Sequence, residues 1–153
     1  HEFDAVMEKE IIAIETDLLK PSKSLHKTAE AMPGFGILAA VGGIIITMQY
    51  LDGPLAQIGY KVSAALVGTF IGIFFCYALL EPLASAMHER CHKLITHLEA
   101  VKAMLVTMQE GKGPLVSVDA GRRVLEMEVK PSFMAMEKMV KEADISKEIV
   151  NNK

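Results

Sequence analysis

Two long stretches without a charged residue dominate the pattern of apolar and polar positions along the chain. They are residues 31–51, AMPGFGILAAVGGIIITMQYL, and residues 62–80, VSAALVGTFIGIFFCYALL. A helix of about 20 apolar residues is long enough to cross the hydrocarbon core of a bilayer. The pattern therefore predicts two transmembrane helices. The segment between them, 52–61, opens with Asp-Gly-Pro and carries one lysine, which favours a tight loop and hence a hairpin.

The segments on either side of the hairpin are amphipathic at helical spacing. Residues 1–30 have apolar side chains at 11, 12, 14, 18 and 19, and Pro21 followed by Ser22 predicts the end of this first helix. Downstream, the second helix is expected to continue until Gly111 to Pro114 stops it. Its apolar positions recur at steps of four and three, a seam that requires a partner helix: Leu83, Met87, Cys91, Leu94, Leu98, Val101, Leu105 and Met108.

The fold class expected from these patterns is an all-α membrane protein, with two transmembrane helices in a hairpin and long cytoplasmic helical extensions. Three parts follow: a cytoplasmic amphipathic segment, 1–30; the hairpin, 31–80; and a cytoplasmic helical region, 81–153. Within the third part, shorter helices are expected around 117–127 and from about 131 to 144. The chain opens at His1 without methionine, inside an amphipathic pattern, so we expect a fragment of a longer protein.

Charge and composition fix the setting. Hydrophobic residues make up 51% of the chain and the mean hydropathy is +0.30, high for a soluble domain. Basic residues flank both spans, which by the positive-inside rule predicts that both ends are cytoplasmic and that the short loop faces outward: Lys20, Lys23, Lys27, Arg90, Lys93 and Lys102. A net charge of -3 gives no support for nucleic-acid binding. Cys76 and Cys91 are expected to be free thiols.

Small residues line one face of each span, and such faces let helices approach closely in lipid. They are Gly36, Ala40, Gly43 and Thr47 in the first span, and Ala64, Gly68, Gly72 and Cys76 in the second. One face is expected to pack within the hairpin, and having two suggests further helices beyond this chain.

Neither span contains an ionisable residue, so a partner must supply the titrating group if ions cross. Thr47 and Thr69 remain as polar candidates to line a path. The alternative for each is a hydroxyl bonded back to its own helix.

One short string suggests a different chemistry. Residues 88–92, HERCH, match the H-E-x-x-H pattern in which two histidines bind zinc and the glutamate acts as a base. A catalytic zinc needs a third protein ligand, and nothing in the sequence marks one; His97 falls off the face shared by His88 and His92. We therefore favour solvated polar residues on a helix, and expect no metal, no cofactor and no catalytic residue.

Five strings, in order, resemble a known family. They are Pro33-Gly-Phe-Gly36 with Ile-Leu-Ala-Ala, Val67-Gly-Thr-Phe-Ile-Gly72, Glu81-Pro-Leu83, Gly121-Arg-Arg123 with Leu125, and Lys130-Pro-Ser-Phe133. Together, from about residue 25 to 140, they resemble MotA, the A subunit of the bacterial flagellar stator, which belongs with TolQ and ExbB. None of the strings is specific alone. The resemblance rests on the order and spacing of all five along the chain.

The resemblance implies the third and fourth helices of a four-helix subunit. Five such subunits would surround two B subunits (MotB-like), whose Asp carries the proton, and the complex would drive the flagellar rotor switch protein through loop residues upstream of this chain. Pro33 and Pro82 would couple ion passage to movement, and Thr69 would line the ion path. Ala40 stands where sodium-driven relatives have threonine, which favours protons.

The function expected is therefore that of a motor stator subunit and not of an enzyme. Three alternatives remain: a TolQ/ExbB-like energiser of envelope machinery, a membrane zinc protease built on residues 88–92, and a simple anchoring hairpin.

Overall fold

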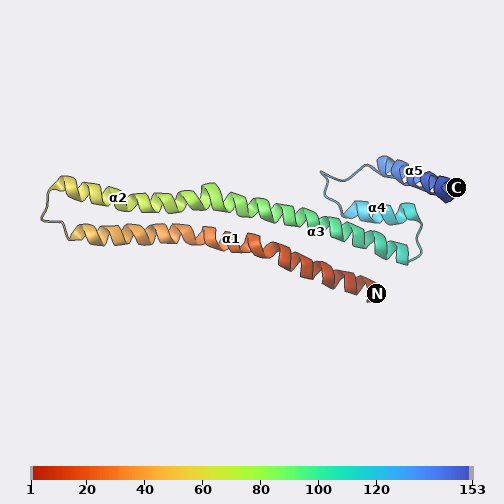
Figure 1. Ribbon diagram of the computed structural model, residues 1–153, viewed down its shortest axis with the longest axis horizontal. Coiled ribbons are helices and arrows are strands. Elements are labelled where there is room, and N and C mark those ends of the chain that lie inside the picture. Colours follow the sequence, from red (N-terminus) through yellow and green to blue (C-terminus); the bar gives the residue numbers. More distant parts are fainter. Residues whose placement is uncertain (1, 152–153) are drawn as a thin grey trace. The chain divides into compact units, whose positions relative to one another are not determined.

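The chain is entirely helical over the part that its computed structural model describes, residues 2–151, with side chains as far as residue 143 (Figure 1). The elements are α1 (Glu2–Met48), α2 (Leu55–Phe74), a π-helical segment (Phe75–Leu80), α3 (Glu81–Gln109), α4 (Pro114–Val124) and α5 (Phe133–Asn151). The all-α prediction is confirmed. The chain divides into two compact units, residues 18–90 and residues 1–17 with 91–153; we call them the hairpin unit and the charged unit.

Helix α1 does not end at Pro21, so that prediction is wrong. The helix runs through both Pro21 and Pro33 without a break. A proline inside a helix removes one backbone hydrogen bond, but it does not remove the packed face. Ser22 and Ala29 lie buried on the packed side of α1, and this packing keeps the helix continuous. The connection to α2 is also shorter than the expected loop 52–61, because α2 already begins at Leu55, after an extended Pro54.

Within the hairpin unit, α1 and α2 pack through their small residues. A Cβ placed on Gly72 would lie 2.6 Å from the carbonyl oxygen of Met32, and one placed on Gly43 would lie 2.5 Å from Cβ of Ala65. The backbones are therefore as close as glycine allows. Both small-residue faces are used against each other within the hairpin, and the expectation of further helices beyond this chain stays a prediction.

The large apolar side chains of the hairpin unit point outward. They include Phe35, Ile37, Leu38, Ile45, Leu66, Phe70 and Tyr77, all more than half exposed. Two continuous helical stretches, Glu2–Met48 and Leu55–Gln109, are long and apolar enough to cross a membrane. Only 17% of the most apolar window of each is buried within the chain, unlike the core helix of a soluble protein.

In the charged unit, α3 ends where the sequence predicts. Gly111 has a φ of +78°, and Lys112 N–H donates to the Thr107 carbonyl, the hydrogen bonds of a helix-terminating glycine turn. Helix α4 then starts with Pro114 in its first turn and packs on α3 at Gly121, where an added Cβ would lie 2.7 Å from the Ala100 carbonyl oxygen.

The face of α3 that packs within this chain is not the predicted seam. Five members of the seam are exposed: Leu83, Leu94, Val101, Leu105 and Met108. The buried positions are instead Ala84, Ile95, Thr96 and Ala100. Two of these four are alanines, which permit close approach as the small residues of the hairpin do, and a pattern of large apolar residues does not reveal that choice. A partner helix for the exposed seam stays a prediction.

Candidate ion-path and hinge site

The two threonines singled out in the spans behave differently. Thr47 donates from Oγ1 to the Gly43 carbonyl of its own helix at 2.8 Å. Thr69 donates instead across the hairpin, to the Gly36 carbonyl on α1 at 3.2 Å. The own-helix alternative therefore holds for Thr47 and is wrong for Thr69. Because a hydroxyl keeps acceptor lone pairs when it donates, Thr69 holds an oriented oxygen acceptor between two uncharged helices.

Ala40 lies close to Thr69 on the same contact. Its side chain is buried, and its backbone nitrogen lies 4.0 Å from the position of a Cβ on Gly68. Gly36 is tighter, because a Cβ there would lie 3.0 Å from both the Gly68 carbonyl oxygen and the Thr69 Cα. The structure thus brings Gly36, Ala40, Gly68 and Thr69 together at one level of the hairpin.

The π-helical segment directly precedes Pro82. Glu81 N–H donates to the carbonyl of Cys76, five residues back, in place of the usual four. Pro82 has no N–H, so a backbone carbonyl in the preceding turn also loses its usual donor. The helix therefore departs from α geometry on the N-terminal side of Pro82. π-turns and prolines are two recognised causes of helix bending, and both occur here in the second long helix.

Two polar contacts join α1 to the helix on either side of Pro82. Ser22 Oγ donates to the Ala84 carbonyl at 2.9 Å in a buried position. His26 Nδ1 lies 2.9 Å from Glu81 Oε2, and its other ring nitrogen lies 3.4 Å from Glu30 Oε1. Sequence reasoning missed these contacts, because nothing in a single sequence relates His26 to a residue 55 positions away.

A cavity of about 440 Å³ lies beside these contacts, all within the hairpin unit. Most of the residues that line it have polar side chains, and both signs of charge are present: Ser22, Lys23, His26, Glu81, Ala84, Ser85, His88 and Glu89. His88 and Glu89 of the HERCH string thus belong to the surroundings of the Pro82 region.

The remaining histidines of that region have other neighbours. His92 Nε2 lies 3.7 Å from Glu126 Oε1 in the charged unit, and His97 Nδ1 contacts the Lys93 carbonyl of its own helix at 2.6 Å. Among the described residues, no group of three or more His, Cys, Asp or Glu side chains is arranged to hold a metal ion.

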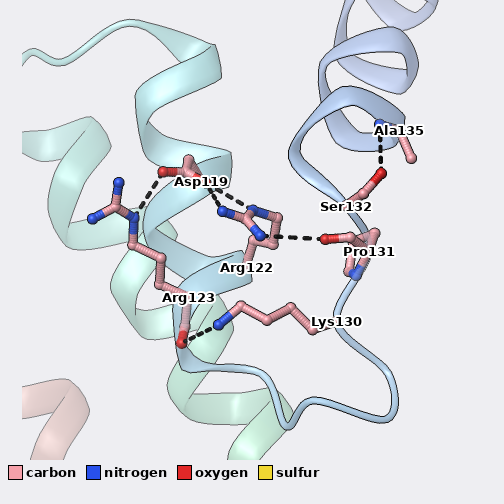
Figure 2. A network of polar contacts seen from close by, with 7 residues as sticks. All are labelled: Asp119, Arg122, Arg123, Lys130, Pro131, Ser132 and Ala135. Carbon is pink, nitrogen blue, oxygen red and sulfur yellow. Dashed lines mark hydrogen bonds and ion pairs between the residues drawn. The ribbon is translucent and has the colours of Figure 1, made fainter.

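A second polar cluster joins two of the sequence strings singled out above, as Figure 2 shows. Asp119, on α4, accepts from Nε of Arg122 and from Nε of Arg123, each at 2.8 Å. Arg122 also donates to the Pro131 carbonyl at 3.3 Å, and Lys130 Nζ donates to the Arg123 carbonyl at 3.2 Å. The Gly-Arg-Arg and Lys-Pro-Ser-Phe strings therefore fix the connection between α4 and α5.

The helix caps and electrostatics of the charged unit follow from these contacts. Ser132 Oγ accepts from Ala135 N–H at 3.2 Å and caps α5. The guanidinium groups of Arg122 and then Arg123 hold the pKa of Asp119 below its usual range. Lys102 bonds to Glu8 and lies 3.0 Å from Asp4 Oδ1, and these carboxylates, Glu8 first, raise the pKa of Lys102.

Two membrane-length spans without charged residues, continued by helices that carry charged side chains, are typical of a membrane channel subunit. The model of the MotA/TolQ/ExbB proton channel family matches residues 1–100, and the chain belongs to this family. The predicted family is confirmed. Because that family consists of channels, the zinc-protease alternative has no further support.

Named relatives match most of this chain. Chemotaxis protein LafT of Vibrio parahaemolyticus is 55% identical over 94% of this chain and 50% of its own length. Motility protein A of Salmonella typhimurium and that of Escherichia coli are each 33% identical over 92% of this chain and 48% of their own length. The chain thus spans about half the length of these relatives.

A solved structure described as Campylobacter jejuni MotAB contains a similar fold. It superposes with a TM-score of 0.74 and 23% sequence identity, over 84% of this chain and 50% of that one. The helical fold of this chain is therefore one already found in that structure.

Proposed function

We propose that this chain is part of a flagellar stator A subunit, which with a MotB-like B subunit conducts protons and turns the flow into torque on the rotor switch protein. The observation that carries the proposal is the 55% identity to Chemotaxis protein LafT along 94% of this chain. The C. jejuni structure is of a complex of two kinds of subunit by its name, which supports a B-type partner here.

The charge-free spans support a division of labour with that partner. A proton crossing the bilayer needs a titrating group at membrane depth, and residues 31–51 and 62–80 contain none. The B subunit therefore supplies an aspartate. This chain supplies the oriented Thr69 oxygen beside the path, and Ala40 at the neighbouring position offers no oxygen to a sodium ion.

Movement is assigned to the prolines. Pro33 lies within α1 and Pro82 follows the π-helical segment, so the second helix can bend at the inner end of its span. We place the hairpin in the bacterial inner membrane, with both ends of the chain in the cytoplasm and the Gln49 to Pro54 turn in the periplasm. The pentameric assembly is proposed on the family likeness alone.

The proposal is tested by swimming of a strain that expresses the full-length protein with Pro82→Leu. We expect flagellated cells that do not swim, with the variant present in the membrane by immunoblot. Normal swimming would contradict a motor role and favour an energiser of envelope machinery or a simple anchor.

Thr69 is tested with a matched pair of variants. Thr69→Leu removes the oxygen and is expected to abolish swimming, whereas Thr69→Ser keeps the hydroxyl that donates to Gly36 and is expected to restore most of it. The corresponding Thr47→Val change removes a hydroxyl that bonds only within its own helix, and should be far milder. Equal defects in Thr69→Leu and Thr69→Ser would remove Thr69 from the ion path.

A further inference from the structure

The structure places a histidine beside the hinge that the proposed function uses. His26 projects from α1 to Glu81, which directly precedes Pro82, and the two side chains lie 2.9 Å apart. Glu81 is also the residue whose backbone N–H closes the π-helical segment, on the Cys76 carbonyl. One residue therefore takes part in both the backbone irregularity and a contact with the other helix.

We infer that His26 is a positioning residue that ties α1 to the Pro82 hinge through Glu81, and that its protonation state sets how firmly the hinge is held. The inference rests on the proposed function, because the hinge matters only if the helix moves. It adds a sensitivity to cytoplasmic pH that the absence of ionisable groups in the spans would not lead one to expect.

The contact changes character with the charge of the imidazole. Histidine is the side chain that gains and loses its proton near neutral pH. Protonated, His26 forms an ion pair with Glu81 and can donate from both ring nitrogens. Neutral, it carries one N–H, which can donate to only one of the two carboxylates that face the ring. The nearby Ser22 to Ala84 hydrogen bond contains no titratable group, so it holds the helices together in both states.

Other charges face the same imidazole. Glu30 approaches its second ring nitrogen from α1 at 3.4 Å. Lys23 on α1, and His88 and Glu89 on α3, line the adjoining cavity. Glu30 and Glu81 thus present negative charge near the imidazole, and Lys23 presents positive charge. The imidazole is about half exposed, so bulk water screens all these charges, and we expect a graded response and no all-or-none switch.

Hydrogen exchange tests the tie without relying on motor function. The sample is the full-length protein with its B partner in lipid nanodiscs, compared at about pH 6 and about pH 8 after correction for intrinsic exchange. In the wild type, peptides covering residues 75–84 should lose protection roughly twofold to fivefold at the higher pH, as expected for a half-exposed pair. His26→Gln should be weakly protected at both values and His26→Lys strongly protected at both.

Two controls sharpen the test. His97→Gln removes a histidine that bonds to its own helix and should behave as the wild type. His26→Gln combined with Glu81→Gln should be no worse than either change alone, since both remove the same contact. Protection of residues 75–84 that is independent of pH in the wild type, or unchanged in His26→Gln, would overturn the inference.

Motility separates this inference from the proposed function. The comparison uses a strain background in which Pro82→Leu alone abolishes swimming. In that background, His26→Gln alone should slow swimming, and His26→Lys alone should swim at the wild-type speed. If His26→Gln alters hydrogen exchange but swims as the wild type does, the role of His26 in positioning the hinge is overturned. Normal swimming of Pro82→Leu itself would instead refute the motor function, whatever the exchange results.

Discussion

The hairpin unit and the charged unit hold their helices together by different interactions. The hairpin unit brings backbones into contact at glycines and leaves its large apolar side chains outside. The charged unit uses one glycine contact, at Gly121, and adds ionic clusters around Asp119 and Lys102. Lipid gives apolar side chains no reason to gather, so close packing must hold the hairpin, whereas in water charges can select one arrangement.

The largest expected effect comes from filling the site where an added Cβ would lie closest to a backbone atom of the facing helix. In Gly72→Ala the new Cβ would lie 2.6 Å from the Met32 carbonyl oxygen and 3.0 Å from the Gly36 Cα, and both neighbours are backbone atoms that cannot rotate away. We expect a loss of about 1–3 kcal/mol or more in stability, as for other overpacked sites. Thermal denaturation of the full-length protein in detergent measures it.

The other helix of the hairpin, α1, offers a control glycine. Gly42 has no heavy atom within 4 Å of an added Cβ, so Gly42→Ala should be neutral or slightly stabilising because alanine favours the helix. If both variants lose equal stability, the hairpin is not held by close backbone approach.

A smaller loss is expected for the glycine contact of the charged unit. In Gly121→Ala the added Cβ would meet the Ala100 carbonyl oxygen at 2.7 Å, but its other neighbour is the flexible side chain of Met104. Partial relief by Met104 suggests a loss of about 1–2 kcal/mol. Hydrogen exchange of residues 114–124 measures it, with Gly113→Ala, whose Cβ meets nothing within 4 Å, as the control.

The next largest effect is expected at the Asp119 cluster, where stability should depend on pH. The pKa of Asp119 is lowered in the folded state by Arg122 and Arg123, so this carboxylate stabilises the fold above the usual aspartate range, and the contribution is lost as pH falls through the lowered value. Hydrogen exchange of the 125–132 connection, after correction for intrinsic exchange, should therefore show less protection at acid pH in the wild type.

Asp119→Asn removes the titrating group while keeping the shape of the side chain. That variant should exchange faster already at neutral pH and show less further change on acidification. An acid response identical in Asp119→Asn and wild type would place the sensitive group elsewhere.

The smallest effect is expected at Lys102, whose carboxylate partners Asp4 and Glu8 are at least half exposed. The raised pKa of Lys102 means that the pairing is fully present at neutral pH and is lost only as pH rises above the usual lysine range. Lys102→Gln should slightly increase exchange of residues 2–10. High salt should produce the same change in the wild type.

A control lysine tests whether this effect is specific. Lys112 lies exposed in the turn between α3 and α4, and Lys112→Gln should leave exchange of residues 2–10 unchanged. A salt response that persists in Lys102→Gln would show that the start of α1 is held by something else.

The sequence alone predicted the hairpin well, because an apolar stretch of about 20 residues without a charge is typical of a transmembrane helix. It also located Gly36, Gly43, Gly68 and Gly72, since small residues at helical spacing indicate close contacts. It did not predict that both small faces would meet each other. Small residues on a helix face show that another helix can approach closely, but they do not identify that helix. His26 was missed for a related reason: a partner 55 residues away leaves no trace in local spacing.

The error at Pro21 has a different origin. Local rules treat proline as the end of a helix, but the buried positions of α1 continue unchanged on both sides of it. Tertiary packing outweighs the loss of one hydrogen bond. The roles of Thr69, Ala40, Pro33 and Pro82 remain proposals, resting on the likeness to the stator family and on the contacts described for them.

The π-helical segment also changes how the second long helix is counted. A π-turn takes up one residue more than an α-turn, and the turn that the Glu81 N–H closes on the Cys76 carbonyl is of this kind. Counted by turns of helix rather than by residue number, residues 75–80 therefore contain one extra residue. A chain shortened by one residue there would form an unbroken α-helix through this segment, and would lose the irregular turn before Pro82.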